Sequence, residues 1–296
     1  MPSPAAAAGP ETLLSPALLA RLRPLASRLL RRSERGESRG GGGGATPEFA
    51  AYRAYTPGDD PRFLDWSVYA KFERLLVKLY APESQGSVCV LLDTSASMRT
   101  GQGEKALCAA RCAAAFAYLG LCVRRPVFLG VFAESLLSVG GPYRHPEALA
   151  DCLRFAVGAP TGEGTRLGVA AADFLSRARG RGHLFVVSDF FQEEPLPAEL
   201  AAIRERAGSL HLAHVLAGRD LEPRLRGTCL IEDPESERRL RLVAGLELQA
   251  QLRELIAEHL DGIASACRNL GIVHGVIRAE DRFDTALLRH LLAQVG

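Results

Sequence analysis

An acid and two serines alternate in the segment DTSAS, at the point where an apolar run of the sequence stops. The three side chains are Asp93, Ser95 and Ser97. In an extended loop every second side chain points to the same side, so all three could reach one ion. Oxygen ligands without His or Cys select a hard cation, and a small octahedral shell completed by water is typical of Mg²⁺. By itself, the segment is equally compatible with a polar turn at the end of a strand.

Two later residues extend this set of oxygen ligands. Asp189 ends a second apolar run, and Thr165 follows the glycine-rich stretch PTGEG at the start of a predicted helix. If the two apolar runs are neighbouring parallel strands, their carboxyl ends form one rim, where ligands bind in open α/β sheets. Thr165 then either caps its helix or faces this rim. Two carboxylates and three hydroxyls would leave an open position on a divalent ion, suited to a carboxylate from elsewhere.

The elements that must position these residues alternate between strand and helix after Ser87. Predicted strands span residues 88–92, 127–132, 184–187 and 210–216, and predicted helices lie near 104–123, 146–156, 166–179 and 197–207. Continuous apolar strands are typical of a sheet covered on both faces. We therefore expect a Rossmann-like, doubly wound α/β sheet that is mostly parallel. A hairpin-like excursion over 229–243, a helix over 246–270, a strand over 272–277 and a helix over 285–294 complete it.

The chain before this domain divides into two further segments. Residues 1–45 contain leucines at helical spacing, which predict an amphipathic helix over 12–32 that is broken at Pro24, and then the glycine-rich stretch SERGESRGGGGGATPE, which predicts a flexible linker. Residues 46–86 are aromatic and rich in turn signals, which favours turn-linked strands in a small extended module. Residues 87–296 then form the α/β domain.

The small module contains the charged stretch PGDDPRFLDW. A packing role is the interpretation we favour, with a turn at Pro57-Gly58 and the chain's one tryptophan seating the segment. The alternative is a surface that docks a partner protein, since a charged loop beside a tryptophan is typical of interfaces. The residues that would form this surface are Asp59, Asp60, Arg62, Asp65 and Trp66.

Composition narrows the class of protein. A formal net charge of +2 and 47% hydrophobic residues indicate a globular protein without a broad basic face for nucleic acid. Seven cysteines, mostly inside apolar segments, favour reduced thiols and a cytoplasmic location. The first residues lack the pattern of a secretory signal, and the apolar stretch 106–123 is better explained as a buried cross-over helix than as a membrane span. Only Lys71, Lys78 and Lys105 are lysines, which we attribute to codon bias.

The segment DTSAS, with Thr165 in a glycine-rich loop and Asp189 ending a later strand, resembles the metal-ion-dependent adhesion site (MIDAS) of von Willebrand factor type A domains. The family pattern of Asp-x-Ser-x-Ser, then Thr, then Asp is matched at all five positions. The resemblance implies a domain whose Mg²⁺ or Mn²⁺ binds an acidic residue of a partner protein without turnover. In such folds the second aspartate often contacts the ion only through water.

A second resemblance involves the upstream sequence RAYTPGDDPRFLDW and the VKLYAPE that follows it. Together they are similar to the signature of the bacterial family called domain of unknown function 58 (DUF58), in which this signature directly precedes a type A-like domain. The resemblance covers residues 45–296 and implies action with a MoxR-type AAA ATPase in assembling or activating other proteins. Many relatives carry two membrane helices before the signature; the residues before it here are not of that kind, so we expect no membrane anchor.

Several patterns in the sequence are also found in enzymes or metal sites of other kinds. A metal-dependent hydrolase or phosphatase acting through Asp93 is the alternative we retain, although the phosphotransferases that begin with a strand-end aspartate need a second acid two residues later, where Ser95 stands. A serine nucleophile lacks a near base, because His183 begins the strand that Asp189 follows, ~20 Å away at ~3.3 Å per residue. Paired histidines and cysteines are explained better by the core: His211 and His214 face opposite sides of a strand, and Cys108 and Cys112 lack a second ligand pair.

Overall fold

The computed structural model describes residues 13–37, 49–56, 60, 64–80, 86–178, 182–192, 194–223, 225, 227–235 and 238–293. The chain forms two compact units. The larger unit contains residues 86–296 together with residues 1–36, and the smaller contains residues 37–85. The helix near the N-terminus therefore belongs with the α/β domain, although the sequence separates the two by the small module.

The larger unit is built on one sheet of six strands in the order β10-β7-β6-β3-β4-β5. All neighbours pair in parallel except β5, which is antiparallel to β4 at the edge. The mostly parallel α/β architecture is as predicted from the apolar runs, whereas β5 was not predicted. That strand is only partly buried and contains Gly140, Gly141 and Pro142, so it lacks the continuous apolar run of the inner strands. The strands are β3 (Val88–Asp93), β4 (Val127–Phe132), β5 (Leu136–Tyr143), β6 (His183–Ser188), β7 (Ser209–Leu216) and β10 (Val273–Arg278).

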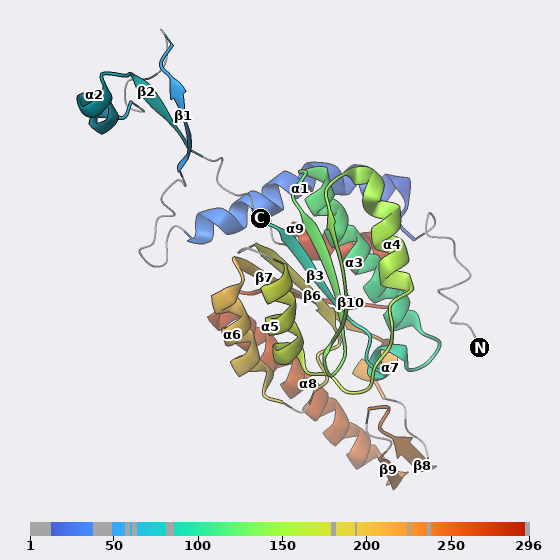
Figure 1. Cartoon of the computed structure of the whole chain (residues 1–296). Coiled ribbons are helices and arrows are strands. Elements are labelled where there is room, and N and C mark those ends of the chain that lie inside the picture. The colour runs from blue at the N-terminus through green and yellow to red at the C-terminus, as the bar shows by residue number, and fades with distance from the viewer. Residues whose placement is uncertain are drawn as a thin grey trace. The chain divides into compact units, whose positions relative to one another are not determined.

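Helices cover both faces of the sheet (Figure 1). Alternate residues of β3 show how the faces divide, since Val88 and Val90 join one hydrophobic cluster and Cys89 and Leu91 the other. This alternation is the period-2 geometry of a strand. The first cluster includes α1 (Pro16–Glu37), α3 (Glu104–Cys122), α4 (Leu149–Val157) and α9 (Phe283–Leu292), and the second includes α5 (Leu167–Arg177), α6 (Leu196–Arg206) and α8 (Leu246–Asn269).

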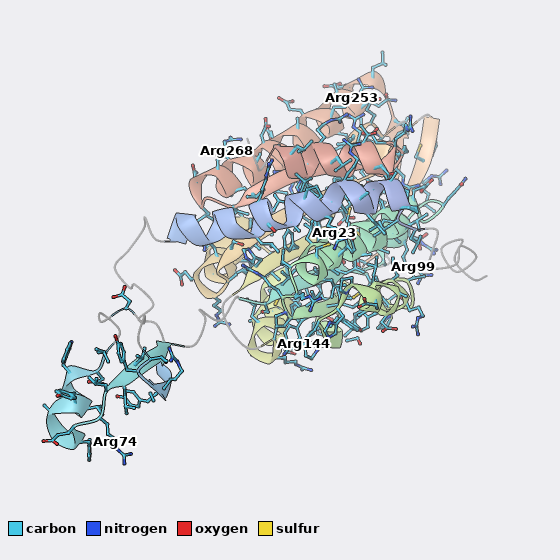
Figure 2. All side chains as sticks on the ribbon, turned by 90° about the horizontal axis from the view of Figure 1, so that it is seen from above. Arg23, Arg74, Arg99, Arg144, Arg253 and Arg268 are labelled. Atoms are coloured by element: carbon cyan, nitrogen blue, oxygen red, sulfur yellow. The ribbon has the colours of Figure 1, made fainter. Side chains whose placement is uncertain are left out.

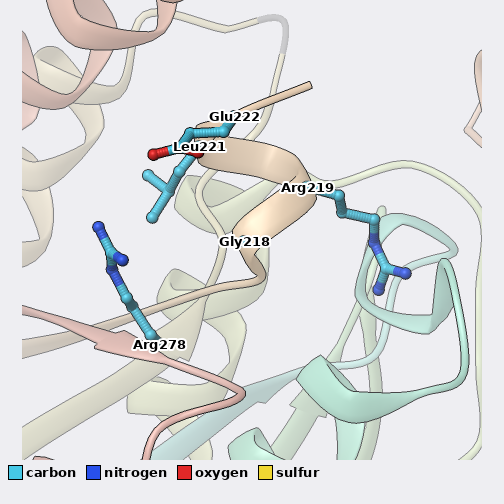
Figure 3. Close-up of a pocket in the computed structure, with 5 residues that line it drawn as sticks. All are labelled: Gly218, Arg219, Leu221, Glu222 and Arg278. Atoms are coloured by element: carbon cyan, nitrogen blue, oxygen red, sulfur yellow. The ribbon is translucent and has the colours of Figure 1, made fainter. Parts of the chain in front are cut away.

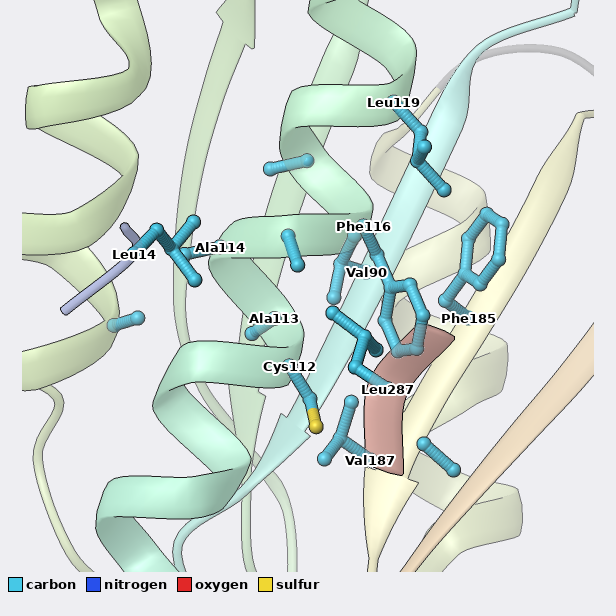
Figure 4. Close-up of a cluster of buried hydrophobic side chains, with 14 of the residues drawn as sticks. Leu14, Val90, Cys112, Ala113, Ala114, Phe116, Leu119, Phe185, Val187 and Leu287 are labelled. Atoms are coloured by element: carbon cyan, nitrogen blue, oxygen red, sulfur yellow. The ribbon is translucent and has the colours of Figure 1, made fainter. Parts of the chain in front are cut away.

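Helix α3 is the central cross-over helix of the first face. Its Phe116 stacks on Phe185 of β6 with ring centroids 4.7 Å apart, in a layer of small and branched side chains (Figure 4). Among the described helices, α3 is the one long and apolar enough to cross a membrane, and 72% of its apolar window is buried inside the protein. Its many alanines allow it to lie close to the strands. Burial against the sheet therefore explains why this helix is so apolar.

Helix α1 crosses the first face without a break at Pro24, so the predicted interruption there is wrong. Proline removes one backbone hydrogen bond from a helix interior. Pro24 is exposed, while Leu22 and Leu25 on either side of it are buried. Burial of this leucine face on both sides of the proline keeps the helix continuous. The helix also extends through Glu37, which includes the first five residues of the predicted linker; the rest of that linker lies outside the described residues.

The smaller unit contains a two-stranded antiparallel sheet of β1 (Phe49–Ala54) and β2 (Leu76–Tyr80) and the helix α2 (Trp66–Phe72). The strands agree with the predicted extended module, whereas α2 was not predicted. The helix begins at Asp65, whose carboxylate accepts hydrogen bonds from the backbone N–H of Ser67 at 2.9 Å and of Val68 at 3.3 Å. A capping aspartate of this kind stabilises the start of a short helix. The helix was not predicted because turn residues dominate the surrounding sequence.

Most positively charged side chains at the protein surface are arginines. The arginines labelled in Figure 2 project from different elements and are all exposed: Arg23, Arg74, Arg99, Arg144, Arg253 and Arg268. The chain has 36 basic residues, of which the three lysines are the exceptions. One of those lysines has a different environment, described below.

Candidate metal centre at the carboxyl rim of the sheet

The two predicted carboxylates lie at the same rim because β3 and β6 are parallel neighbours. Leu92 pairs with Val187 in this register, so the residues that follow each strand leave the sheet side by side. Both side chains are buried, with exposed fractions of 1% for Asp93 and 0% for Asp189. The topological expectation from the apolar runs is therefore met for these two residues.

Ser95 and Ser97 come together through a turn and not through an extended loop. The backbone N–H of Ser95 donates to Asp93 Oδ1 at 2.9 Å, which folds the chain back after the strand. The two serine hydroxyl oxygens then lie 3.1 Å apart, and Ser97 begins a short 3-10 helix, η4 (Ser97–Arg99). Ser95 and Ser97 lie close together as predicted, but the local geometry is that of an aspartate-stabilised turn.

Thr165 does not cap the helix that it precedes. Helix α5 has Arg166 at its N-cap and no side-chain capping bond. The Thr165 hydroxyl is buried, and it makes no hydrogen bond to any part of the chain that the structure describes. A buried hydroxyl without a partner is costly, so its presence here requires an explanation.

Sequence reasoning missed a buried cation at this rim. Lys105 of α3 is 2% exposed, and its Nζ lies 2.7 Å from Asp189 Oδ2 and 3.0 Å from Asp220 Oδ2. Asp220 belongs to the short helix α7 (Gly218–Leu221) and also accepts from the Ala217 backbone N–H at 2.9 Å. The rarity of lysine in the sequence did not single out Lys105, because Lys71 is equally rare in type and is exposed.

A second missed residue is Ser188, the last residue of β6. Its hydroxyl donates to Asp93 Oδ2 at 2.5 Å and accepts from the backbone N–H of Phe190 at 2.9 Å. Both Asp93 oxygens are thus oriented by the two strand ends. Ser188 could have been suspected from its place immediately before Asp189, where the apolar run stops.

Negative charge dominates the electrostatics of the rim. Burial raises the pKa of Asp93, and the neighbouring carboxylate of Asp189 raises it further. Burial also raises the pKa of Asp189, and Lys105 works in the opposite direction. Two carboxylates that disfavour each other's ionisation create a site where an added cation would be stabilised.

The donor set suits a hard divalent cation. Asp93, Ser95, Ser97, Thr165 and Asp189 offer only oxygen atoms, the ligands that Mg²⁺ and Mn²⁺ take. The unpartnered hydroxyl of Thr165 is the observation that fits best, because a cation would supply the contact that this atom lacks. Lys105 neutralises part of the charge of Asp189, so Asp93 is the carboxylate with no cationic partner among the contacts described here.

A pocket lies beside the rim, lined by Gly218, Arg219, Leu221, Glu222 and Arg278 (Figure 3). The Arg219 side chain points away from Arg278, toward the loop after η4. There it donates to the Thr100 carbonyl at 2.6 Å and to Glu104 Oε2 at 3.1 Å. Arg219 therefore ties α7 to the loop that carries the serines and does not act as a free anion ligand.

The predicted docking residues of the smaller unit separate into different roles. Asp65 caps α2 and accepts from the Tyr52 hydroxyl at 2.7 Å, which is a structural role. Trp66 is 60% exposed and contacts Tyr69 edge-on at 6.3 Å between ring centroids. Asp60 is partly buried, while Asp59 and Arg62 lie outside the described residues. The docking role thus stays a prediction, and Trp66 is the residue whose exposure is compatible with it.

Comparison with known proteins gives the family. A family model described as "Protein of unknown function DUF58" matches residues 51–260. The chain belongs to the DUF58 family. In this DUF58 chain the match runs from the small unit through strands β3 to β7 into α8 and ends before β10, so it includes Asp93, Thr165 and Asp189. No curated protein matches the chain.

Solved structures resemble this DUF58 protein only distantly. The conserved hypothetical protein BatB from Bacteroides thetaiotaomicron is 14% identical with a TM-score of 0.40, and covers 71% of this chain and 98% of its own. An aerotolerance-related membrane protein from Bacteroides fragilis, crystallised with multiple mutations to serines, is 16% identical with a TM-score of 0.41 and the same coverage, 71% and 98%. Likenesses of this degree carry no argument about function, which must come from the site.

Proposed function

We propose that this DUF58 protein is a non-enzymatic, divalent-metal-dependent binding protein. Its type A-like domain would hold Mg²⁺ or Mn²⁺ through Asp93, Ser95, Ser97, Thr165 and Asp189, and the ion would bind an acidic residue of a partner protein. The observation that carries the proposal is the buried hydroxyl of Thr165, which has no hydrogen-bond partner among the described residues, in a protein whose strand-end carboxylates Asp93 and Asp189 are also buried. Such a combination is unfavourable without a cation and favourable with one.

The chain's own residues would divide the work at this site. Asp93 would supply the main charge, and Ser188 and the Ser95 backbone N–H hold its two oxygens in place. The serine and threonine hydroxyls are neutral ligands, so they would leave an excess of positive charge on the ion. A bound divalent ion with that excess attracts a carboxylate electrostatically, which is the chemistry it would supply here.

The partner and the location follow from the family resemblance and not from the geometry. We propose that the protein acts in the cytoplasm with a MoxR-type AAA ATPase, in assembling or activating other proteins. The metal ion would then bind an acidic residue of the ATPase or of the protein on which the ATPase acts. The exposed Trp66 of the smaller unit is a second place where such a partner would make contact.

Metal binding is tested by titrating the full chain with Mn²⁺ and following the free ion by electron paramagnetic resonance. Asp93→Asn should weaken Mn²⁺ binding by more than about tenfold, since removing one charged ligand costs several kcal/mol in a buried site. Asp173→Asn is the matched control, because Asp173 is an exposed acid of α5 that pairs with Arg177 at 2.7 Å. Equal affinities for the wild type and Asp93→Asn would contradict the proposal.

The binding function is tested by affinity capture with Mg²⁺, with a chelator, and with Asp93→Ala. A partner held through the ion should be lost in the second and third conditions. Capture of the same proteins in all three would exclude metal-mediated recognition. Phosphate release from a phosphorylated substrate that depends on Asp93 would instead favour the hydrolase and contradict the non-enzymatic proposal.

A further inference from the structure

The hairpin between β7 and α8 brings a further acid to the carboxyl rim. It consists of β8 (Gly227–Glu232) and β9 (Arg239–Ala244), which pair antiparallel with each other in a separate two-stranded sheet. Figure 1 shows the hairpin outside the six-stranded sheet, next to the start of α8. Glu235 lies in the connection between its strands, and nothing in the rim site described so far uses it.

The carboxylate of Glu235 is bound by two backbone N–H groups of the rim. Ser97 N donates to Oε1 at 2.7 Å, and Gly164 N donates to Oε2 at 2.5 Å. These two donors come from the turn that carries Ser95 and from the loop that carries Thr165. Two N–H groups from separate loops that converge on one carboxylate form a geometrically specific anion pocket, and hydrogen bonds to an ionised group are stronger than neutral ones.

Two backbone hydrogen bonds hold the described part of the connection around Glu235. The backbone N–H of Asp233 donates to the Arg238 carbonyl at 2.8 Å, which closes the turn. The backbone N–H of Glu235 donates to Asp233 Oδ1 at 2.9 Å. Glu235 is therefore held by hydrogen bonds within its own hairpin as well as by its contacts with the rim.

The rest of the hairpin is poorly buried. Leu230, Leu240 and Val243 are 64%, 62% and 73% exposed. A two-stranded hairpin without a covered apolar face is marginally stable at best. The contact of Glu235 with Ser97 and Gly164 is consequently a large part of what fixes the hairpin tip at the rim, and losing it should release the tip without unfolding the domain.

We propose that Ser97 N and Gly164 N form a carboxylate-binding pocket that Glu235 fills from within the chain, and that an aspartate or glutamate of a partner binds there by displacing Glu235. The identification of the ligand as a protein carboxylate rests on the proposed function, while the pocket itself rests on the two hydrogen bonds to Glu235. The hairpin is then an internal competitor. Its tethered carboxylate has a high effective concentration, so only a partner with additional contacts displaces it.

The test uses acetate as the carboxylate probe and the full ¹⁵N-labelled chain, with the amide signals of Ser97 and Gly164 as reporters. In Glu235→Ala, acetate should shift both signals and saturate at a concentration at least about tenfold lower than in the wild type, because the tethered competitor is gone. Glu232→Ala is the matched control. Glu232 lies in the same hairpin, is exposed and pairs with Arg239 at 2.9 Å, so its loss should leave the response as in the wild type.

Glu235→Gln keeps the size of the side chain and removes its charge, and it should give an acetate response between those of the wild type and Glu235→Ala. If Glu235→Ala does not fold, the acetate response of Glu235→Gln still tests whether Glu235 occupies the pocket. Equal acetate responses in the wild type and both Glu235 variants would overturn the proposal. All titrations are run with chelator, since the pocket is made of protein N–H groups. A negative Mn²⁺ titration would therefore contradict the proposed metal function while the acetate result still decides the pocket.

Discussion

Both ends of strand β6 carry buried polar groups, but the two ends are of different kinds. At its start, His183 Nε2 lies 2.7 Å from Arg125 Nη1 and His183 Nδ1 lies 2.8 Å from Ser209 Oγ, which in turn lies 3.1 Å from His211 Nε2. At its end, Asp189 and Asp93 are buried next to each other, beside Lys105. Burial of polar groups is common to both ends, so burial by itself does not indicate a functional site.

The difference lies in the charge balance of the polar groups at the two ends. Arginine only donates, so His183 must accept at Nε2 and donate from Nδ1 to Ser209, whose hydroxyl then donates to His211. The hydrogen bonds of this chain all have one consistent direction, and burial keeps the His183 imidazole neutral by lowering its pKa. At the other end Asp189 and Asp220 share the ammonium group of Lys105, Asp93 is buried without an ion pair among the described residues, and the Thr165 hydroxyl has no hydrogen-bond partner among them. The excess of carboxylates over cations at the carboxyl end is the feature on which the proposed metal site rests.

The largest expected effect is the loss of the buried cation at the carboxyl end. Lys105→Met should reduce the free energy of unfolding by about 3–5 kcal/mol, because it leaves buried carboxylates without their counter-ion. Denaturant titration in the presence of chelator measures this loss. Adding Asp220→Asn to the variant should restore part of the stability, since it removes one of the uncompensated charges. A loss below about 1 kcal/mol for Lys105→Met would mean that the carboxylates are protonated and would remove the charge mismatch on which the comparison depends.

The amino end should respond to pH and not to metal. Burial, and then the positive charge of Arg125, lower the pKa of His183 to about 3 from 6.5. The unfolded chain therefore binds a proton that the folded chain does not, and this part of the stability is complete above pH 6.5 and is lost as the pH falls toward 3. Through His183, the wild type should lose about 2 kcal/mol of its free energy of unfolding between pH 7 and pH 5, and His183→Gln should lack this part of the loss. Unfolding titrations at both pH values, with and without Mg²⁺, measure the effect. A wild-type slope retained in the variant would show that His183 is protonated in the fold.

The smallest and sharpest test deletes one hydroxyl at each end. Ser209→Ala should destabilise the protein by about 1–2 kcal/mol, because it leaves the ring nitrogen of His183 without its acceptor. Thr165→Val should stabilise it by about 1 kcal/mol in chelator, because an unsatisfied buried hydroxyl is replaced by a methyl group, and should weaken Mn²⁺ binding. The opposite signs in denaturant titrations are the prediction. Destabilisation by Thr165→Val in chelator would show that its hydroxyl has a partner in the folded protein.

Much of the α/β domain could be predicted because its strands are buried on both faces and read as continuous apolar runs. β3, β4, β6 and β7 follow the predicted bounds to within one residue at every end, and the predicted hairpin, strand and helices of the C-terminal part are all present. β5 and α2 could not be predicted, because a half-exposed edge strand and a short helix started by one capping aspartate have no apolar period. The break predicted at Pro24 failed because tertiary burial outweighs one lost hydrogen bond.

By itself, the sequence determined the buried inner strands of the sheet and the oxygen-bearing residues that follow them, since both depend on local hydrophobic pattern. It therefore placed Asp93 and Asp189 at one rim once the strands were neighbours. Only the tertiary structure decided the rest of the site. Lys105, Asp220 and Glu235 come from three other elements and reach the rim through contacts between residues 84, 115 and 138 positions apart in the chain. Long-range contacts of this kind have no local signature, because the charge partner of a buried carboxylate is chosen by packing and not by sequence spacing.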